Sequence, residues 1–265
     1  MIPVFRKKEE WSSYRDGLPD AKTLGFVPTM GGLHEGHCSL IRRSLAENDF
    51  TVVSIFLNRT QFNNVADFES YPANFEQDVA LLQDLGIGAV FAPDYDSMYP
   101  DNYAYVVSEA LDSKPMEGAE RPGHFDGVLT VVLKLLNIVS PDRAYFGEKD
   151  YQQLQLVKGM VQAFFLPVEI VACETVRAED GLALSSRNHR LSREARALSA
   201  MFPRILNTSE DSKEAECELK KAGFDVEYVE DKDGRRYGAV RLEGVRLIDN
   251  FALRTISQKI ERSRR

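Results

Sequence analysis

The sequence predicts a protein of the α/β class, in which helices cover a parallel sheet and a smaller α+β domain follows. The first two-thirds of the 265 residues alternates short apolar runs with helical patterns. Strand, helix and strand in repetition place the strands parallel to one another. After about Thr175 the pattern changes to charged and polar segments. We therefore expect a sheet domain over residues 1–175, a small C-terminal domain over 176–253 and a frayed, disordered basic tail over 254–265.

The first predicted strand covers residues 23–27 and ends in the glycine-rich turn 28–32. A helix is predicted from about residue 36 to 48, because its leucines and isoleucine fall on one face. Residues 50–57 are rich in β-branched and aromatic side chains, which is typical of a buried strand. These elements form the first strand–helix–strand unit.

The next predicted helix begins at Asn74, which forms a capping-box pattern with Gln77, and ends before Gly86 in the C′ position. The later elements of the sheet domain are strands at 89–92, 143–146 and 168–172 and helices at 128–139 and 150–164. The small domain is predicted to hold a charged helix at 190–206 interrupted by Pro203, a polar stretch at 207–221, and strands at 225–229 and 238–242 joined by a turn at 231–234.

Composition excludes several classes of protein. The 33 basic and 41 acidic residues give a net charge of −8, which argues against a protein that coats nucleic acid. Three cysteines far apart in sequence favour reduced thiols over a disulfide framework or a zinc knuckle. The N-terminus becomes charged after five residues, unlike a signal peptide, and no apolar run reaches the ~20 residues of a membrane span. We expect a cytoplasmic protein without a membrane or nucleic-acid partner.

The first motif with chemical meaning is PTMGGLHEGH at residues 28–37, between the first strand and a helix. His34 and His37 can direct ring N–H groups at one point beside the backbone donors of the helix start, which suits a phosphate. The spacing excludes a His-Glu-x-x-His zinc protease. The alternative is a pair of ordinary helix-start histidines.

The second motif, FGEKDYQQ at residues 146–153, also joins a strand to a helix. Asp150 and Gln153 lie one turn apart, and Lys149 lies at the strand end. Because ligands of open α/β sheets bind at the carboxyl ends of the strands, both motifs should face one crevice. The alternative is that Asp150 only caps the helix.

Three weaker segments complete the set. Ser185, Ser186 and Arg187 supply hydroxyl and guanidinium donors that suit a polyphosphate, although a solvated turn is the alternative. Residues 117–127 are predicted to form a structured loop that leads into a helix. Residues 58–62 follow the second strand and bring neutral donors to the same end of the sheet as the other motifs. The chain has neither usual glycine-rich nucleotide loop.

Together the five segments closely resemble the pantoate–β-alanine ligase (pantothenate synthetase) family. This family is a member of the nucleotidyltransferase superfamily that shares a His-x-Gly-His-type signature with class I aminoacyl-tRNA synthetases. The resemblance runs from about Thr23 to Leu191 and returns at residues 246–250. It implies a Rossmann-like doubly wound parallel sheet with a second, smaller α+β lid domain. The implied activity is condensation of pantoate with β-alanine through a pantoyl adenylate, with ATP as co-substrate, Mg²⁺ and a homodimer.

The resemblance also implies roles for individual residues. The catalytic set is His34, His37, Lys149 and Arg187. The ATP-binding set adds Met30, Gly147, Asp150, Val176, Leu184, Ser185 and Ser186. Pantoate is implied to contact Gln61, Gln153 and Met30. Asn58, Tyr71, Arg121 and His124 fall in active-site segments without an assigned duty, and Asp78 is implied to position the magnesium shell through water.

This sequence departs from the family at three places. Arg59 stands where the family usually has proline, and Cys38 stands where an apolar or amide side chain is common. The stretch 207–245, within the predicted domain 176–253, is shorter than is usual for the second domain. Two other functions are alternatives. Another nucleotidylyltransferase would need a basic pocket for a phosphorylated acceptor, which neutral Gln61 and Gln153 do not suggest. A regulator that has lost catalysis is disfavoured by the intact histidines.

Overall fold

A computed structural model describes residues 1–19 and 22–253 of the chain. The chain divides into two compact units, Met1–Val176 and Arg177–Arg265. The basic tail predicted at 254–265 lies outside the described residues. Each unit has its own hydrophobic core.

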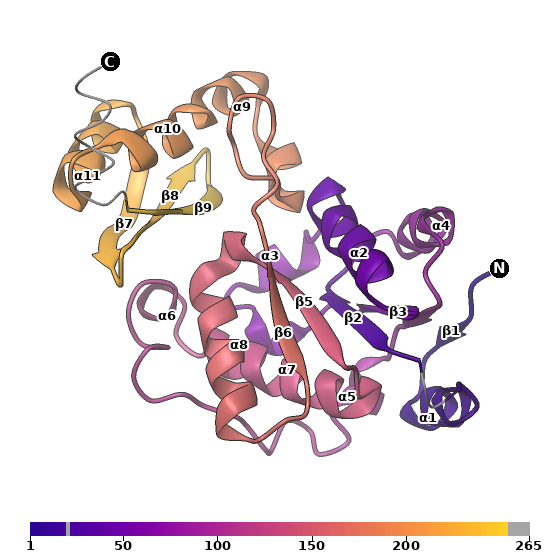
Figure 1. Ribbon diagram of the computed structural model, residues 1–265. Helices are drawn as coiled ribbons and strands as arrows, with labels where there is room; N and C mark the ends of the chain where they lie inside the picture. The colour runs from indigo at the N-terminus through magenta and orange to yellow at the C-terminus, as the bar shows by residue number, and fades with distance from the viewer. Residues whose placement is uncertain (20–21, 254–265) are drawn as a thin grey trace. The chain divides into compact units, whose positions relative to one another are not determined.

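The first unit contains a six-stranded parallel sheet of order β1-β4-β3-β2-β5-β6 (Figure 1). The strands are β1 Val4–Phe5, β2 Leu24–Thr29, β3 Phe50–Ile55, β4 Ala89–Phe91, β5 Arg143–Gly147 and β6 Glu169–Cys173. The helices are α1 Lys8–Asp16, α2 Glu35–Glu47, α3 Val65–Glu69, α4 Phe75–Leu85, α5 Tyr95–Met98, α6 Glu117–Glu120, α7 His124–Val139 and α8 Tyr151–Ala163. Two 3₁₀ turns, η1 Arg59–Gln61 and η2 Glu148–Asp150, follow β3 and β5.

Helices cover both faces of this sheet. Alternate residues of each strand therefore point into two different cores. On β2, Phe26 packs in the core that includes residues of α1, α7 and α8, and Val27 packs in the core that includes residues of α2 and α4. The predicted α/β class and doubly wound sheet are therefore confirmed. No helix in the described part of the chain has the length and apolar content that a membrane span requires.

Local signals predicted several boundaries well. The Asn74 side chain accepts a hydrogen bond from the Gln77 amide (3.1 Å), and Gly86 ends α4 in the left-handed conformation at φ 79°. Helix α7 begins at His124, four residues before the predicted start. The reason is a left-handed Gly123 (φ 80°) that turns the chain directly into the helix.

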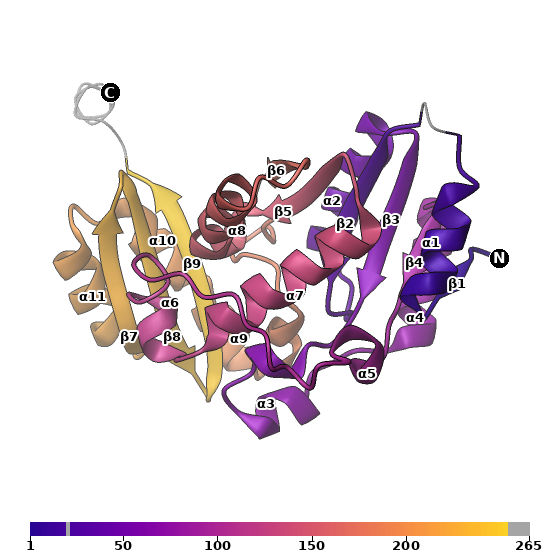
Figure 2. The same ribbon diagram turned by 90° about the horizontal axis from the view of Figure 1, so that it is seen from below.

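The second unit is an antiparallel three-stranded sheet with helices on one face (Figure 2). The strands are β7 Asp225–Lys232, β8 Arg235–Leu242 and β9 Val245–Ala252, and the helices are α9 Arg193–Ser199, α10 Met201–Thr208 and α11 Ser212–Lys221, after the 3₁₀ turn η3 Ser186–Arg190. Two-residue turns at Asp233-Gly234 and Glu243-Gly244 join the strands, with positive φ at both positions of each turn.

The sequence patterns did not predict three features of this unit. The helix at 190–206 is divided at Ala200, and Pro203 lies in the first turn of α10, where its missing N–H has no helical partner. The polar stretch at 207–221 contains helix α11, because Asp211 caps it and Ala215 and Leu219 are buried one turn apart. The third strand, β9, was not predicted as a strand.

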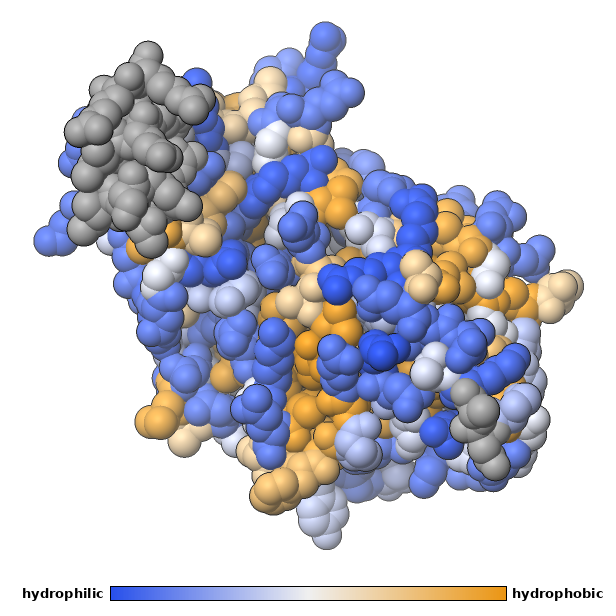
Figure 3. Space-filling model, in the orientation of Figure 1, coloured by the Kyte–Doolittle hydropathy of each residue, from blue (hydrophilic) through white to orange (hydrophobic). Residues whose placement is uncertain are grey.

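The face of the first unit seen in Figure 3 carries a hydrophobic band along the edge strand β6. Phe164 and Phe165, in the turn between α8 and β6, are 53% and 90% exposed. One edge of β6 has no neighbouring strand in the described sheet. This is the most apolar surface that the view of the first unit shows.

Candidate active site at the switch point of the sheet

The chain changes direction across the sheet between β2 and β5. From β2 it continues outward to β3 and β4, and it then returns to β5 on the other side of β2. In open α/β sheets such a reversal leaves a crevice beyond the carboxyl ends of the two strands. Residues 30–37 follow β2 and residues 148–153 follow β5, so the two principal motifs of the sequence both begin at this crevice.

A buried carboxylate shapes the turn between β2 and α2. Gly31 and Gly32 have φ values of 81° and 65°, which only glycine adopts readily. The Asp78 carboxylate is 5% exposed and accepts hydrogen bonds from the amides of Gly32 (2.8 Å) and Leu33 (2.9 Å). The Tyr71 hydroxyl donates to the Gly31 carbonyl (3.4 Å). We name residues 29–37 the histidine turn, and Asp78 holds its first half.

The second half of the histidine turn contains the two histidines. His34 caps α2, and its Nδ1 accepts from the Gly36 amide (3.1 Å), while Nδ1 of His37 accepts from the His34 amide (3.3 Å). A backbone amide can only donate, so both neutral rings carry their proton on Nε2. The ring centroids lie 4.2 Å apart. Burial, with contributions from His34 and Lys149, lowers the pKa of His37 to about 3, so this ring is a neutral donor at physiological pH.

Lys149 brings positive charge to the histidine pair. It lies in η2, directly after β5, and its Nζ is 3.6 Å from Oδ2 of Asp150. Its effect on the pKa of His37 shows that the two motifs share one electrostatic environment. Asp150 occupies the cap position of α8, but its carboxylate makes no capping hydrogen bond. Gln153 is half-buried in the first turn of that helix.

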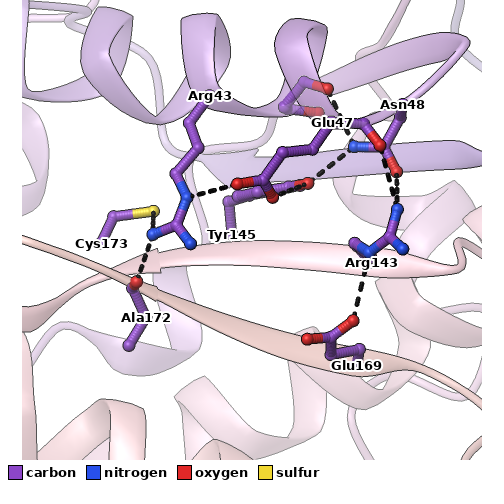
Figure 4. Close-up of polar contacts among 9 residues, drawn as sticks. Arg43, Glu47, Asn48, Arg143, Tyr145, Glu169, Ala172 and Cys173 are labelled. Atoms are coloured by element: carbon purple, nitrogen blue, oxygen red, sulfur yellow. Dashed lines mark hydrogen bonds and ion pairs between the residues drawn. The ribbon is translucent and has the colours of Figure 1, made fainter.

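A polar cluster anchors the C-terminal half of α2 to β5 and β6 (Figure 4). The Tyr145 hydroxyl donates to Glu47 Oε2 (2.9 Å) and accepts from Asn48 Nδ2 (2.7 Å). Arg43 bonds Glu47 (2.9 Å) and donates to the carbonyl of Ala172 in β6 (2.6 Å). Burial raises the pKa of Tyr145 to about 12. The cluster therefore fixes α2, which follows His34, relative to β5, the strand that leads to Lys149.

The segment after β3 presents Gln61. Its Nε2 donates to the Met30 sulfur (3.1 Å), and its Oε1 accepts from Asn58 Nδ2 (3.1 Å). Two of the predicted pantoate-binding residues are thus in contact. We name residues 58–62 the glutamine loop. A Cβ on Gly127 would lie 2.6 Å from the carbonyl of Thr60, so α7 packs directly on this loop.

Arg121 and His124 hold the backbone of the glutamine loop. His124 Nδ1 donates to the Gln61 carbonyl (2.8 Å), and Arg121 Nη2 donates to the same oxygen (3.3 Å). Arg121 Nη1 also bonds His124 Nε2 (3.0 Å), which requires an unprotonated Nε2. Burial and the Arg121 charge lower the pKa of His124 to about 4. The sequence placed both residues in an active-site segment, and the structure shows that they contact Gln61.

Arg59, the departure from the family pattern, is exposed at the start of η1. Asn58 before it has extended backbone angles (φ −82°, ψ 103°). An extended residue can precede proline, and the first position of a helix accepts proline. The position therefore tolerates either residue.

The Ser-Ser-Arg segment belongs to the second unit and is held within it. Ser185 caps η3 through the Arg187 amide (3.3 Å), and Ser186 is buried. The loop leading to it is anchored by Arg177, whose guanidinium makes two hydrogen bonds, of 2.6 and 2.9 Å, to the buried Asp249 carboxylate. Leu184 lies half-buried in this loop, and Val176 is the last residue of the first unit.

Two residues that hold neighbouring segments through hydrogen bonds were not identified from the sequence. The Tyr99 hydroxyl donates to Asn58 Oδ1 (2.8 Å). The buried Gln152 accepts from the Glu117 amide (3.2 Å) and donates to the carbonyls of Asp112 and Pro115 (2.9 Å each). The available signal for Tyr99 was the four-residue spacing of tyrosines at 95, 99 and 103. Gln152 was not singled out, because the predicted pantoate contact was assigned to its neighbour Gln153.

Comparison with known proteins gives matches over nearly the whole chain. The family described as pantoate-beta-alanine ligase matches residues 3–252. Pantothenate synthetase of Bdellovibrio bacteriovorus is 50% identical over 253 residues, which are 96% of this chain and all of that protein. Pantothenate synthetase of Legionella pneumophila (strain Lens) is 47% identical over 252 residues, with 95% and 100% coverage.

Solved structures agree with this result. The pantoate-beta-alanine ligase of Francisella tularensis, complexed with beta-gamma ATP and beta-alanine, superposes with a TM-score of 0.91 at 39% identity. The match covers 95% of this chain and 98% of that one. Pantothenate synthetase of Thermus thermophilus gives a TM-score of 0.86 at 41% identity, covering 95% and 99% of the two chains.

Proposed function

This chain belongs to the pantoate–β-alanine ligase family, and we propose that it condenses pantoate with β-alanine to form pantothenate while converting ATP to AMP and pyrophosphate. The observation in the structure that carries this proposal is the pair of neutral histidines with Nε2–H donors, beside Lys149 at the helix start. Neutral and cationic donors gathered at a helix N-terminus suit a polyphosphate. The amide of Gln61 lies on Met30 of the same turn.

The reaction requires activation of a carboxylate, whose own leaving group would be oxide. In the proposed first step a carboxylate oxygen of pantoate attacks the α-phosphorus of ATP, and the bond to the bridging oxygen breaks to release pyrophosphate. In the second step the amine of β-alanine attacks the acyl carbon of pantoyl adenylate, loses a proton and displaces AMP. Catalysis by this chain then consists of positioning the reactants and stabilising developing charge.

Individual roles follow from where the residues lie. His34, His37 and Lys149 would bind the phosphates, and Gln61 and Gln153 would bind pantoate, with Met30 between the two substrates. Asp150 would bind ribose, since its carboxylate makes no capping bond. A Cβ on Gly147 would meet no atom within 4 Å, which leaves room for a nucleotide over the end of β5. In the second unit, Ser185, Ser186 and Arg187 would clamp the polyphosphate and Leu184 would contact ATP. Val176, the last residue of the first unit, would also contact ATP.

Magnesium fits this site as an ion that ATP carries. The described residues contain no group of three or more histidine, cysteine or acidic side chains that could hold a metal. Mg²⁺ commonly binds through substrate phosphates and one or two carboxylates, and it would neutralise phosphate charge. Both oxygens of Asp78 already accept backbone hydrogen bonds, which favours a duty in shaping the turn over direct coordination. A homodimer and a cytoplasmic location stay predictions of the sequence.

Isotope exchange tests the proposed reaction. Protein with ATP, Mg²⁺ and pantoate should exchange labelled pyrophosphate into ATP without β-alanine, because the first step is reversible and needs no amine. Adding β-alanine should yield pantothenate and AMP in equal amounts. Exchange only with a different acid, or only with a phosphorylated acceptor, would contradict the assignment and favour another nucleotidylyltransferase.

A further inference from the structure

The side chain of Asn58 uses its full hydrogen-bonding capacity. Its Oδ1 accepts from the hydroxyls of Tyr99 (2.8 Å) and Thr60 (3.0 Å), and its Nδ2 donates to Gln61 Oε1 (3.1 Å) and the Gly127 carbonyl (3.2 Å). An amide has two donors and two acceptor sites. Asn58 is 1% exposed, so these four partners determine which way its amide points.

The orientation of Asn58 sets the orientation of Gln61. The Gly127 carbonyl can only accept, and therefore Nδ2 of Asn58 must lie on that side and also face Gln61. Gln61 then presents Oε1 to Asn58 and turns Nε2 toward Met30. If the Asn58 amide were reversed, its oxygen would face Gln61, and the Gln61 amide would have to reverse as well. The substrate side would then meet an acceptor oxygen, which repels a carboxylate.

Tyr99 holds the Asn58 amide in place by donating to its Oδ1, while the Gly127 carbonyl, which can only accept, opposes a reversal. Tyr99 lies directly after α5 and is 1% exposed. Its ring contacts Phe56 (centroids 6.2 Å apart), and Lys134 Nζ lies 4.6 Å from its centroid. Burial raises the pKa of Tyr99 to about 12, so the hydroxyl keeps its proton across the working pH range.

We propose that Tyr99 is a positioning residue for the hydroxy-acid substrate, acting through Asn58 to keep the Nε2–H of Gln61 directed at that substrate. The inference rests on the proposed function, because it takes pantoate to be the ligand of Gln61. Tyr99 itself contacts no reactant. Its effect is transmitted over two consecutive hydrogen bonds, from Tyr99 to Asn58 and from Asn58 to Gln61.

The test compares Tyr99→Phe with Tyr95→Phe. Tyr99→Phe keeps the ring and removes only the hydroxyl, and kcat/KM for pantoate should fall about 5- to 30-fold, the range for one buried hydrogen bond. The KM for ATP should stay within about twofold. Tyr95 packs against Tyr99 (centroids 4.9 Å apart) but is 38% exposed, and its variant should behave as the parent enzyme. Thermal unfolding of both variants reports on folding.

A double-mutant cycle with Gln61→Ala separates positioning from general support. If Tyr99 acts through Gln61, adding Tyr99→Phe to Gln61→Ala should change kcat/KM for pantoate by less than about twofold. Thr60→Val provides a second variant at a half-buried position, and it removes the other hydroxyl donor to Asn58. It should show the same pattern as Tyr99→Phe, with a smaller effect because Thr60 is only half-buried and its hydrogen bond to Oδ1 is longer (3.0 Å against 2.8 Å).

The outcomes distinguish this inference from the proposed function. If the parent enzyme does not use pantoate at all, the proposed function fails and the inference with it. If the parent uses pantoate, the inference is overturned when Tyr99→Phe leaves the pantoate parameters unchanged. It is equally overturned when pantoate and ATP are affected alike, or when the loss in the Gln61→Ala background is as large as in the parent.

Discussion

The histidine turn and the glutamine loop are held in different ways, although Met30 and Gln61 bring them into contact. In the histidine turn, one carboxylate and two glycines in left-handed conformations shape the backbone. In the glutamine loop, side chains of the loop bond one another, and Tyr99, Arg121 and His124 from later segments add further hydrogen bonds. Loss of Asp78 alone should therefore disrupt the structure of the histidine turn. A single substitution around the glutamine loop should remove only part of its function.

The largest expected effect is that of Asp78→Ala. The substitution leaves the Gly32 and Leu33 amides without their buried acceptor, so the free energy of unfolding should fall by about 2–5 kcal/mol. Pyrophosphate exchange should fall with it. Urea unfolding and exchange rates measure both quantities, and Asp84→Ala, at an exposed position of α4, is the control. A higher Mg²⁺ requirement with unchanged stability would instead support the magnesium role.

The next effect is that of His34→Ala and His37→Ala. Each removes a donor that acts most strongly as charge develops on pyrophosphate, and kcat for adenylation should fall about 10²- to 10³-fold. Amide formation from preformed pantoyl adenylate should change much less. His189→Ala, in the second unit, is the control in single-turnover assays. Equal loss in both half-reactions would show that the histidines only hold the structure.

The pH dependence of stability should reflect two histidines, His37 in the histidine turn and His124 beside the glutamine loop. Both have pKa values below the ordinary 6.5, about 3 and about 4, chiefly through burial. The unfolded chain therefore binds more protons than the folded one below pH 6.5, and stability should decrease as the pH falls from 6.5 toward 4. Each histidine contributes up to about 1.4 kcal/mol per pH unit in that window.

The comparison variant for this pH effect is His124→Gln, whose amide can still donate to the Gln61 carbonyl. The groups that face His124 are Arg121, Glu117 and Asp150, and the variant leaves all three in place. Urea unfolding at pH 7 and pH 5 should show a weaker pH dependence for the variant than for the parent. The same pH dependence in both proteins would exclude His124 as a source.

The smallest effect is expected at Arg59. Because Arg59 is exposed and Asn58 is already extended, Arg59→Pro should be neutral or raise stability by about 0.4–1 kcal/mol, by restricting the unfolded chain. The KM for pantoate should stay the same. Arg59→Ala separates loss of the guanidinium from the effect of proline. A large rise in the pantoate KM in both variants, persisting at moderate salt, would show that the guanidinium binds the substrate.

Much of the fold follows from local patterns along the chain. Alternating apolar strands and amphipathic helices predicted the parallel sheet, and the Asn74 cap and Gly86 predicted the bounds of α4. The second unit was predicted less well. Helix α11 has only Ala215 and Leu219 in the core, so its polar sequence carries a weak periodic signal, and its packing against the sheet of the second unit supplies the stability that propensity does not.

Hydrophobic periodicity, caps and glycine turns act over a few neighbouring residues, and they were therefore enough to predict the sheet class and the motifs at the ends of β2 and β5. How the glutamine loop beside those motifs is held depends on contacts between residues that are far apart in sequence. Tyr99 and Asn58 are 41 residues apart, and His124 and Gln61 are 63 apart. Such contacts form when the strand order is set. The Gln61 carbonyl then selects the tautomer of His124, and burial lowers the pKa of His37 and His124. No local pattern encodes the orientation of the Asn58 amide or the proton position on His124, because their partners lie far away in sequence.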